Sequence, residues 1–149
     1  MGYNYDLHDQ IKQAVIAGIV ELSLEKIGTN VVDQQIKDMT NVELPAVCVC
    51  IEDDVEEPMH GDTETTDWWY PVSVYIFGRV SVHDTSEQKW VMRQRAAIMK
   101  NFDQRSLANL PVTVMYVTPR PIFDFIRDQY QTLITGLTIR VWASEVRQN

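Results

Sequence analysis

Two short runs of residues, 46–51 and 72–77, have strand-like patterns, and they constrain the fold more than any other feature of the chain. The first run is apolar at every position, which predicts a strand covered on both faces. In the second run, valine and isoleucine alternate with polar or aromatic residues. Pro71 cannot donate a backbone hydrogen bond, so the beginning of this strand should lie at an edge or a bulge. We expect the two strands to pair antiparallel as a long hairpin.

Two longer stretches have the three- and four-residue spacing of helices. Residues 5–28 form the first, and Gly28 is the expected end of that helix. Residues 84–102 form the second, which begins with a capping box. Between the first helix and the first strand, residues 29–45 are a polar connection for which a short helix and an edge strand both remain open.

The second half of the chain supplies two further strands, expected over residues 112–118 and 131–146. Gly136 should mark a bulge, and residues 119–130 are expected to form an irregular connection. The predicted order is therefore helix, strand, strand, helix, strand, strand. It predicts an α+β fold, with a mostly antiparallel four-stranded sheet, helices packed against it, and a long acidic β-hairpin between the first two strands.

Length and charge limit the function. A chain of 149 residues is expected to form a single domain, residues 1–149. Its net charge of −8 argues against general nucleic-acid binding and against docking on an anionic membrane. The beginning lacks the features of a signal peptide, and no apolar run approaches the length of a membrane span. Cys48 and Cys50 are expected to be buried, reduced thiols.

The segment between the first two strands is strongly acidic. No lysine or arginine occurs between Lys37 and Arg79. The candidate acidic residues of the hairpin are Asp53, Asp54, Glu56, Glu57, Asp62, Glu64 and Asp67. With His60 among them a divalent metal site is conceivable, but a solvated loop is the simpler interpretation. Because no catalytic, nucleotide-binding or zinc motif occurs in the sequence, we expect no enzyme activity, no metal and no cofactor.

Two groups of residues are candidates for contact with partners. Trp68, Trp69 and Tyr70 follow the acidic segment, and exposed aromatic residues are common interface anchors. In a strand, however, one of the two tryptophans would point into the core. Arg93, Arg95 and Lys100 give the second helix a basic side, for which a solvated surface is the alternative interpretation.

The arrangement of these segments resembles the tail terminator, or tail completion, proteins of long-tailed bacteriophages. The resemblance rests on the long opening helix, "ELPAVCVCIEDD", the hairpin into "YPVSVYIFGRV", the helix "SEQKWVMRQRAAIMKNF" and the closing strand "YQTLITGLTIRVWASE". It covers almost the whole chain, although residues 118–128 have no counterpart in the pattern.

The resemblance implies a structural virion protein of the tail or neck, assembled in the host cytoplasm. Its copies would form a six-fold ring on the last ring of tail tube protein, stop tube growth and join the head connector or stopper protein. In a contractile tail the sheath protein would be a further partner, and DNA would pass through without specific binding.

The acidic segment then has a physical interpretation. It would line a lumen that repels DNA, or it would form a seam with a neighbouring subunit, where the basic side of the second helix would meet it. The alternatives are another neck component, such as a head–tail adaptor or stopper, a soluble metal-dependent enzyme, and a monomeric binding module.

Overall fold

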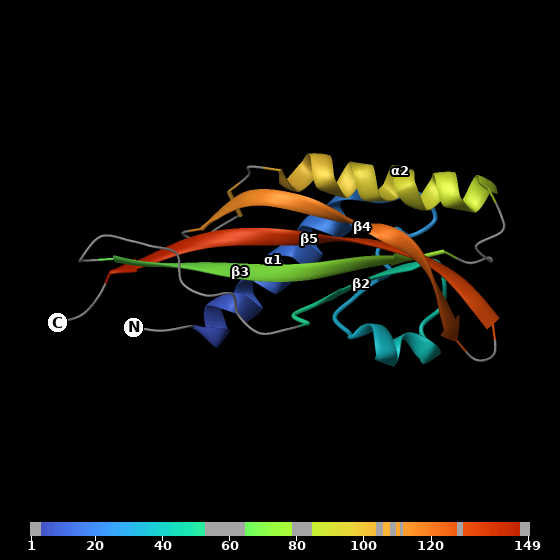
Figure 1. The fold of residues 1–149 in the computed structure, drawn as a ribbon, viewed down its shortest axis with the longest axis horizontal. Helices are drawn as coiled ribbons and strands as arrows, with labels where there is room; N and C mark the ends of the chain where they lie inside the picture. Colours follow the sequence, from blue (N-terminus) through green and yellow to red (C-terminus); the bar gives the residue numbers. More distant parts are fainter. Residues whose placement is uncertain are drawn as a thin grey trace.

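A computed structural model describes residues 4–52, 65–78, 85–103, 106–107, 110, 112–127 and 130–146. The chain is an α+β protein (Figure 1). Its elements are, in order, α1 (Tyr5–Leu22), β1 (Val31–Val32), the 3₁₀ helix η1 (Ile36–Asn41), β2 (Ala46–Cys50), β3 (Thr65–Phe77), α2 (Thr85–Phe102), β4 (Thr113–Arg127) and β5 (Tyr130–Val146).

The described strands form one sheet in the order β1-β2-β3-β5-β4. The expected antiparallel pairing of β2 with β3 is confirmed, and β3–β5 and β5–β4 are antiparallel too. The prediction of four strands was wrong, because the polar connection before β2 contains both an extra strand and a short helix. This extra strand, β1, pairs parallel to β2.

Both α-helices lie on the same face of the sheet. In Figure 1, α1 runs behind β3 and β5. It packs against β1, β2 and β3, whereas α2 packs against β3, β4 and β5. The main core lies between the helices and this face and includes Ile11, Val74, Ile98 and Ile139, all fully buried. A smaller core lies on the other face, where η1 covers β2, and the complete burial of β2 confirms that both of its faces are covered.

The first helix is shorter than its sequence pattern predicts. The Asn4 side chain accepts a hydrogen bond from the Leu7 backbone N–H and caps the beginning of α1. The helix ends at Leu22, because Ser23 has the left-handed conformation, with φ 49°, and its backbone N–H bonds to the Val20 carbonyl. Gly28, the expected end, instead lies in a turn with φ 57°.

The strand β4 corrects the largest error of the sequence prediction. Residues 119–130 were expected to form an irregular connection, but β4 continues to Arg127 and pairs with β5 along its length. Pro119 and Pro121 are tolerated because β4 is the last strand of the sheet. β4 has one extra residue between Arg120, which pairs with Gly136, and Phe123, which pairs with Ile134. The bulge predicted at Gly136 therefore lies in β4, the strand that faces Gly136.

Pro71 occupies the position in β3 that its chemistry requires. The described pairs of β2 with β3 extend only from Ser73 to Phe77, so Pro71 lies beyond the last of them. Its carbonyl oxygen accepts a 2.8 Å hydrogen bond from Nε2 of His8 on α1. The expectation that this strand begins at an edge is therefore confirmed on the β2 side.

Candidate functional site: an arginine and aromatic face of the sheet

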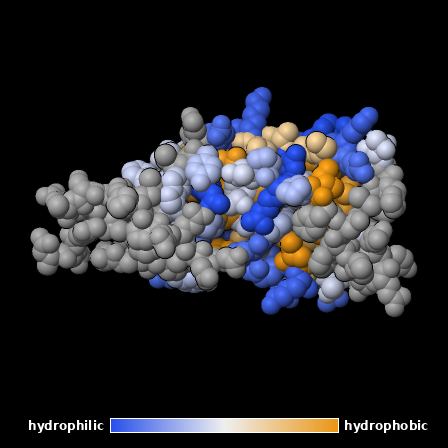
Figure 2. Space-filling model, in the orientation of Figure 1, coloured by the Kyte–Doolittle hydropathy of each residue, from blue (hydrophilic) through white to orange (hydrophobic). Residues whose placement is uncertain are grey.

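The face of the sheet opposite the two α-helices carries arginine and aromatic side chains where η1 does not cover it. We call this surface the arginine face and define it by Trp69, Tyr116, Thr118, Arg120 and Arg140. Figure 2 shows hydrophilic residues crossing the middle of the molecule on this side, with hydrophobic ones next to them.

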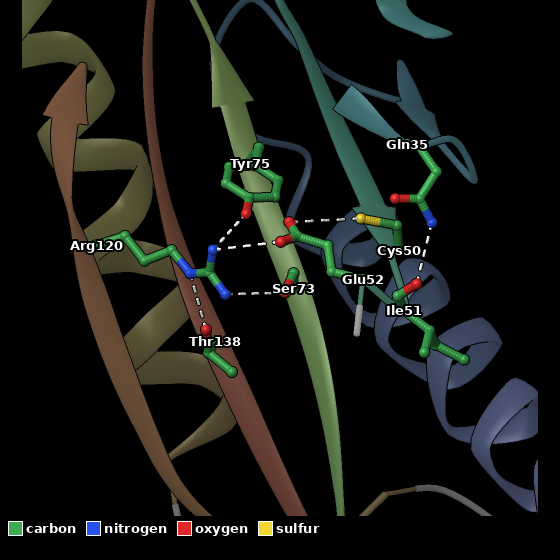
Figure 3. A network of polar contacts seen from close by, with 8 residues as sticks. All are labelled: Gln35, Cys50, Ile51, Glu52, Ser73, Tyr75, Arg120 and Thr138. Atoms are coloured by element: carbon green, nitrogen blue, oxygen red, sulfur yellow. Dashed lines mark hydrogen bonds and ion pairs between the residues drawn. The ribbon is translucent and has the colours of Figure 1, made fainter. Parts of the chain in front are cut away.

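Arg120 on β4 is the centre of a polar network that reaches across the sheet (Figure 3). Its Nε donates to Oγ1 of Thr138 on β5 at 3.0 Å, and Nη2 donates to Oγ of Ser73 on β3 at 3.2 Å. Nη1 donates to the Tyr75 hydroxyl and lies 3.5 Å from Oε2 of Glu52, the second residue after β2. Arg120 therefore links β4 to β5, to β3 and to the residue that lies two positions after β2.

The absence of a side chain at Gly136 leaves space for the Tyr75 ring of this network. Gly136 lies between Tyr75 on β3 and Arg120 on β4 in the register of the sheet. A Cβ atom at this position would lie 2.7 Å from the Val74 carbonyl oxygen and 2.9 Å from Cδ1 of Tyr75. Because a backbone oxygen cannot move aside cheaply, the close approach of the Tyr75 ring requires glycine here.

The backbone of Arg120 is held from the helical side. Its carbonyl oxygen accepts hydrogen bonds from Nη1 of Arg95 on α2 at 2.7 Å and from Oγ1 of Thr135 at 3.3 Å. Arg95 also donates to Oγ1 of Thr135 at 2.9 Å. The guanidinium of Arg95, which was predicted to take part in a ring or partner interface, is thus engaged within its own chain next to the register shift of β4 between Arg120 and Phe123.

The Tyr75 hydroxyl and the Cys50 thiol stay protonated in the folded protein at neutral pH. Burial raises the pKa of the Tyr75 hydroxyl well above its ordinary value, and a hydrogen bond with Glu52 adds to this, while the charge of Arg120 acts in the opposite direction. Burial also raises the pKa of the Cys50 thiol to about 12, with the Glu52 carboxylate contributing in the same direction. Cys50 is therefore a poor nucleophile at neutral pH, and Tyr75 serves as a hydrogen-bonding group.

Next to this network lies an aromatic cluster. The rings of Trp69 and Tyr116 meet edge to face, with centroids 5.5 Å apart. The guanidinium carbon of Arg140 lies 5.7 Å from the centroid of the Tyr116 ring. Tyr116 keeps 43% of its surface exposed, which makes it one of the few large hydrophobic side chains in the described residues that face solvent.

The predicted aromatic anchors separate in the structure. Trp69 is half-buried on the arginine face, whereas Tyr70 is fully buried under α1, with its ring 5.2 Å from that of His8. The assignment of Tyr70 to an interface was therefore wrong, because successive residues of a strand point to opposite faces. Trp68 lies in β3 opposite Ala143.

The predicted basic side of α2 is retained in part. Arg93 and Lys100 are exposed, as is Lys89, and none of them makes an ion pair with another described residue. Of the acidic candidates, Asp53, Asp54, Glu56, Glu57, Asp62 and Glu64 lie outside the described residues. Asp67 lies in β3 opposite Ser144.

A separate hollow of about 470 Å³ lies beside α1 and is lined by Tyr5, Lys12, Asp33, Gln34, Gln35, Asp38, Cys50 and Ile51. Lys12 bridges Asp9 and Asp33, with Nζ 3.0 Å from an oxygen of each carboxylate. Burial lowers the pKa of Lys12, but the bonds to the two carboxylates outweigh it, and the pKa is raised overall. The lysine therefore remains charged and balances the acids of the hollow.

Within the described part of the chain, no group of three or more histidine, cysteine, aspartate or glutamate side chains is placed to hold a metal ion. No helix in the described ranges combines the length and apolar content needed to cross a membrane.

No protein-family model matches the sequence, and no curated protein matches it significantly.

Sequence reasoning missed the residues that organise this surface, which are Tyr116, Arg120 and Arg140. Arg120 lies in the segment expected to be irregular, and its partners are 18 to 68 positions away in the sequence. The sequence does contain one signal for this part of β4. Tyr116, Thr118 and Arg120 occupy every second position, with apolar Val117 between the first two. This alternation continues the strand pattern into the proline-containing segment.

Proposed function

We propose that this chain is a structural protein of a bacteriophage neck, namely a tail terminator. Its copies would form a ring, a hexamer by the family resemblance, on the last ring of tail tube protein. This ring would stop tube growth and join the head connector or stopper protein, and it would contact the sheath protein in a contractile tail. DNA would pass through without specific binding.

The observation that carries the proposal is the composition of the arginine face. Tryptophan, tyrosine and arginine are the residue types most enriched at the energetic centres of protein interfaces. Here Tyr116 contacts both Trp69 and Arg140 on a broad sheet face, beside the polar network of Arg120. We assign this surface to the contact with tail tube protein.

The overall plan of the subunit also favours this role. The six main elements follow the order of the resemblance, and the two α-helices lie on one sheet face, so the part of the other face that η1 does not cover is left for contacts. Strands β3, β4 and β5 have 13, 15 and 17 residues, far longer than the usual strand of about five or six. Such strands support a long, rigid surface, as a subunit that must fit a tube requires.

Electron microscopy of the protein mixed with assembled tail tubes tests the proposal. We expect a ring at one tip of each tube, and an arrest of further tube growth. Replacing Trp69 and Tyr116 with alanine should weaken capping by roughly tenfold or more, because each is placed as an interface anchor. Tyr5→Ala is the matched control, since Tyr5 is an exposed tyrosine on another surface, with 60% of its area accessible.

Circular dichroism must show that the variants remain folded. If the double variant caps tubes as well as the control, the assignment of the arginine face is wrong. If the wild-type protein binds isolated head connectors but no tube, the chain is an adaptor or stopper. Binding to neither structure would contradict a role in the neck.

A further inference from the structure

The outer side of α2 carries a continuous exposed stripe of six residues. We call this set the α2 stripe; its members are Lys89, Met92, Arg93, Ala96, Ala97 and Lys100. These residues follow each other at three- and four-residue spacing, so they share one side of the helix over about 17 Å. Met92 is 44% exposed.

The charges of the α2 stripe are not compensated within the helix. Lys89 and Arg93 have no aspartate or glutamate at i+3 or i+4; Lys100 has Asp103 at i+3, but the two do not form an ion pair. Lys89 and Arg93 are themselves four residues apart, which places like charges on adjacent turns. Small alanines and an exposed methionine between the cations leave space for another chain to lie close to the helix.

We infer that the α2 stripe binds the acidic segment, residues 52–67, of a second copy of this chain. This inference rests on the proposed ring and deepens it, because it assigns the acidic segment to the seam between subunits. The segment has eight carboxylates and no lysine or arginine, and it is the most acidic part of a chain with a net charge of −8. Charge complementarity therefore selects it as the partner of the three cations.

The acidic segment begins on the side of the sheet away from the α2 stripe. Glu52 is tied to Arg120 on the arginine face, whereas α2 lies behind the opposite face.

The inferred contact therefore joins two subunits. Such a contact joins two different surfaces, which is the arrangement that closes a ring.

Charge reversal tests the inference by native mass spectrometry and analytical ultracentrifugation, with and without tail tubes. The triple variant Lys89→Glu, Arg93→Glu, Lys100→Glu should weaken subunit association at least about tenfold at 0.1 M salt. The variant Glu56→Lys, Glu57→Lys, Asp62→Lys should do the same. A chain that carries both sets of reversals should regain association.

Two controls separate this contact from general charge effects. Lys37→Glu changes the net charge as much as the single reversal Arg93→Glu and replaces another exposed cation, so it should leave association unchanged. In 1 M salt the difference between wild type and the triple variants should shrink, because the Debye length falls to about 3 Å.

The outcomes distinguish the inference from the proposed function. Rings that cap tubes and are unaffected by the triple reversals would overturn the inference and leave the function standing. Association that depends on the α2 stripe without any binding to tubes would support the inference and overturn the function. A wild-type chain that stays monomeric with and without tubes would overturn both.

Discussion

Replacing Arg120 with methionine is the sharpest test of the polar network, because methionine keeps much of the side-chain volume and removes every polar contact. The change deletes hydrogen bonds to Ser73, Tyr75 and Thr138 and the ion pair with Glu52. A hydrogen bond to a charged group contributes about 1.5–3 kcal/mol when buried. The side chains of Arg120 and Glu52 are 35% and 26% exposed, so solvent reduces these values and the ion pair adds at most about 1 kcal/mol.

We therefore expect Arg120→Met to lower the free energy of unfolding by about 2–3 kcal/mol, which corresponds to a fall in Tm of about 5–10 °C for a chain of this size. Urea unfolding followed by circular dichroism measures the first quantity, and calorimetry the second. Arg93→Met is the matched control, and we expect it to change stability by less than about 0.5 kcal/mol because Arg93 is exposed. Equal effects of the two substitutions would refute the network.

Two further predictions concern the packing of the sheet and the edge of β3. Gly136→Ala should cost about 1–3 kcal/mol in urea unfolding, because the new Cβ would lie 2.7 Å from the Val74 carbonyl oxygen; an unchanged midpoint would contradict this contact. Burial lowers the pKa of His8 and the charge of Lys12 adds to this, while the hydrogen bond to the Pro71 carbonyl and the charge of Asp9 oppose it. Below about pH 6.5 the unfolded chain therefore takes up a proton before the folded one, and stability falls. The variant His8→Gln should lose less stability than wild type between about pH 6.5 and 5, and parallel pH curves would count against the assignment.

The parts of the fold that could be predicted from sequence are those whose pattern is local. The second helix, the fully buried strand β2 and the long strand β5 each follow from hydrophobic spacing over one short window. The end of α1 could not be predicted in this way, because Leu24 continues the apolar spacing beyond the actual end at Leu22. There the left-handed conformation of Ser23, which is unusual for a residue other than glycine, ends the helix.

The errors in the candidate site have a different cause, since they depend on partners that are distant in sequence. Arg95 has the spacing of an exposed helix residue, but its guanidinium donates a hydrogen bond to the carbonyl oxygen of Arg120, where the register of β4 shifts. Tyr70 and Trp69 are neighbours in the sequence, and only the sheet register decides which of them faces the helices. For Pro119 and Pro121, the decisive fact was the edge position of β4, which is a property of the complete sheet.

Through Arg120, β4 contacts the first residue of the acidic segment, although the two lie far apart in the order of elements. The guanidinium crosses β5 and β3 to hold Glu52, the residue at which the acidic segment begins. Gln35, which immediately precedes η1, donates a 3.0 Å hydrogen bond to the Ile51 carbonyl oxygen and so fixes the residue before Glu52. Ile51 and Glu52 are therefore held by two side chains that are far apart in the sequence. Glu52 is therefore held on the face of the sheet opposite α2. In the contact that we infer between subunits, the network that stabilises the subunit would also hold the first residue of the acidic segment away from the α2 stripe of its own chain.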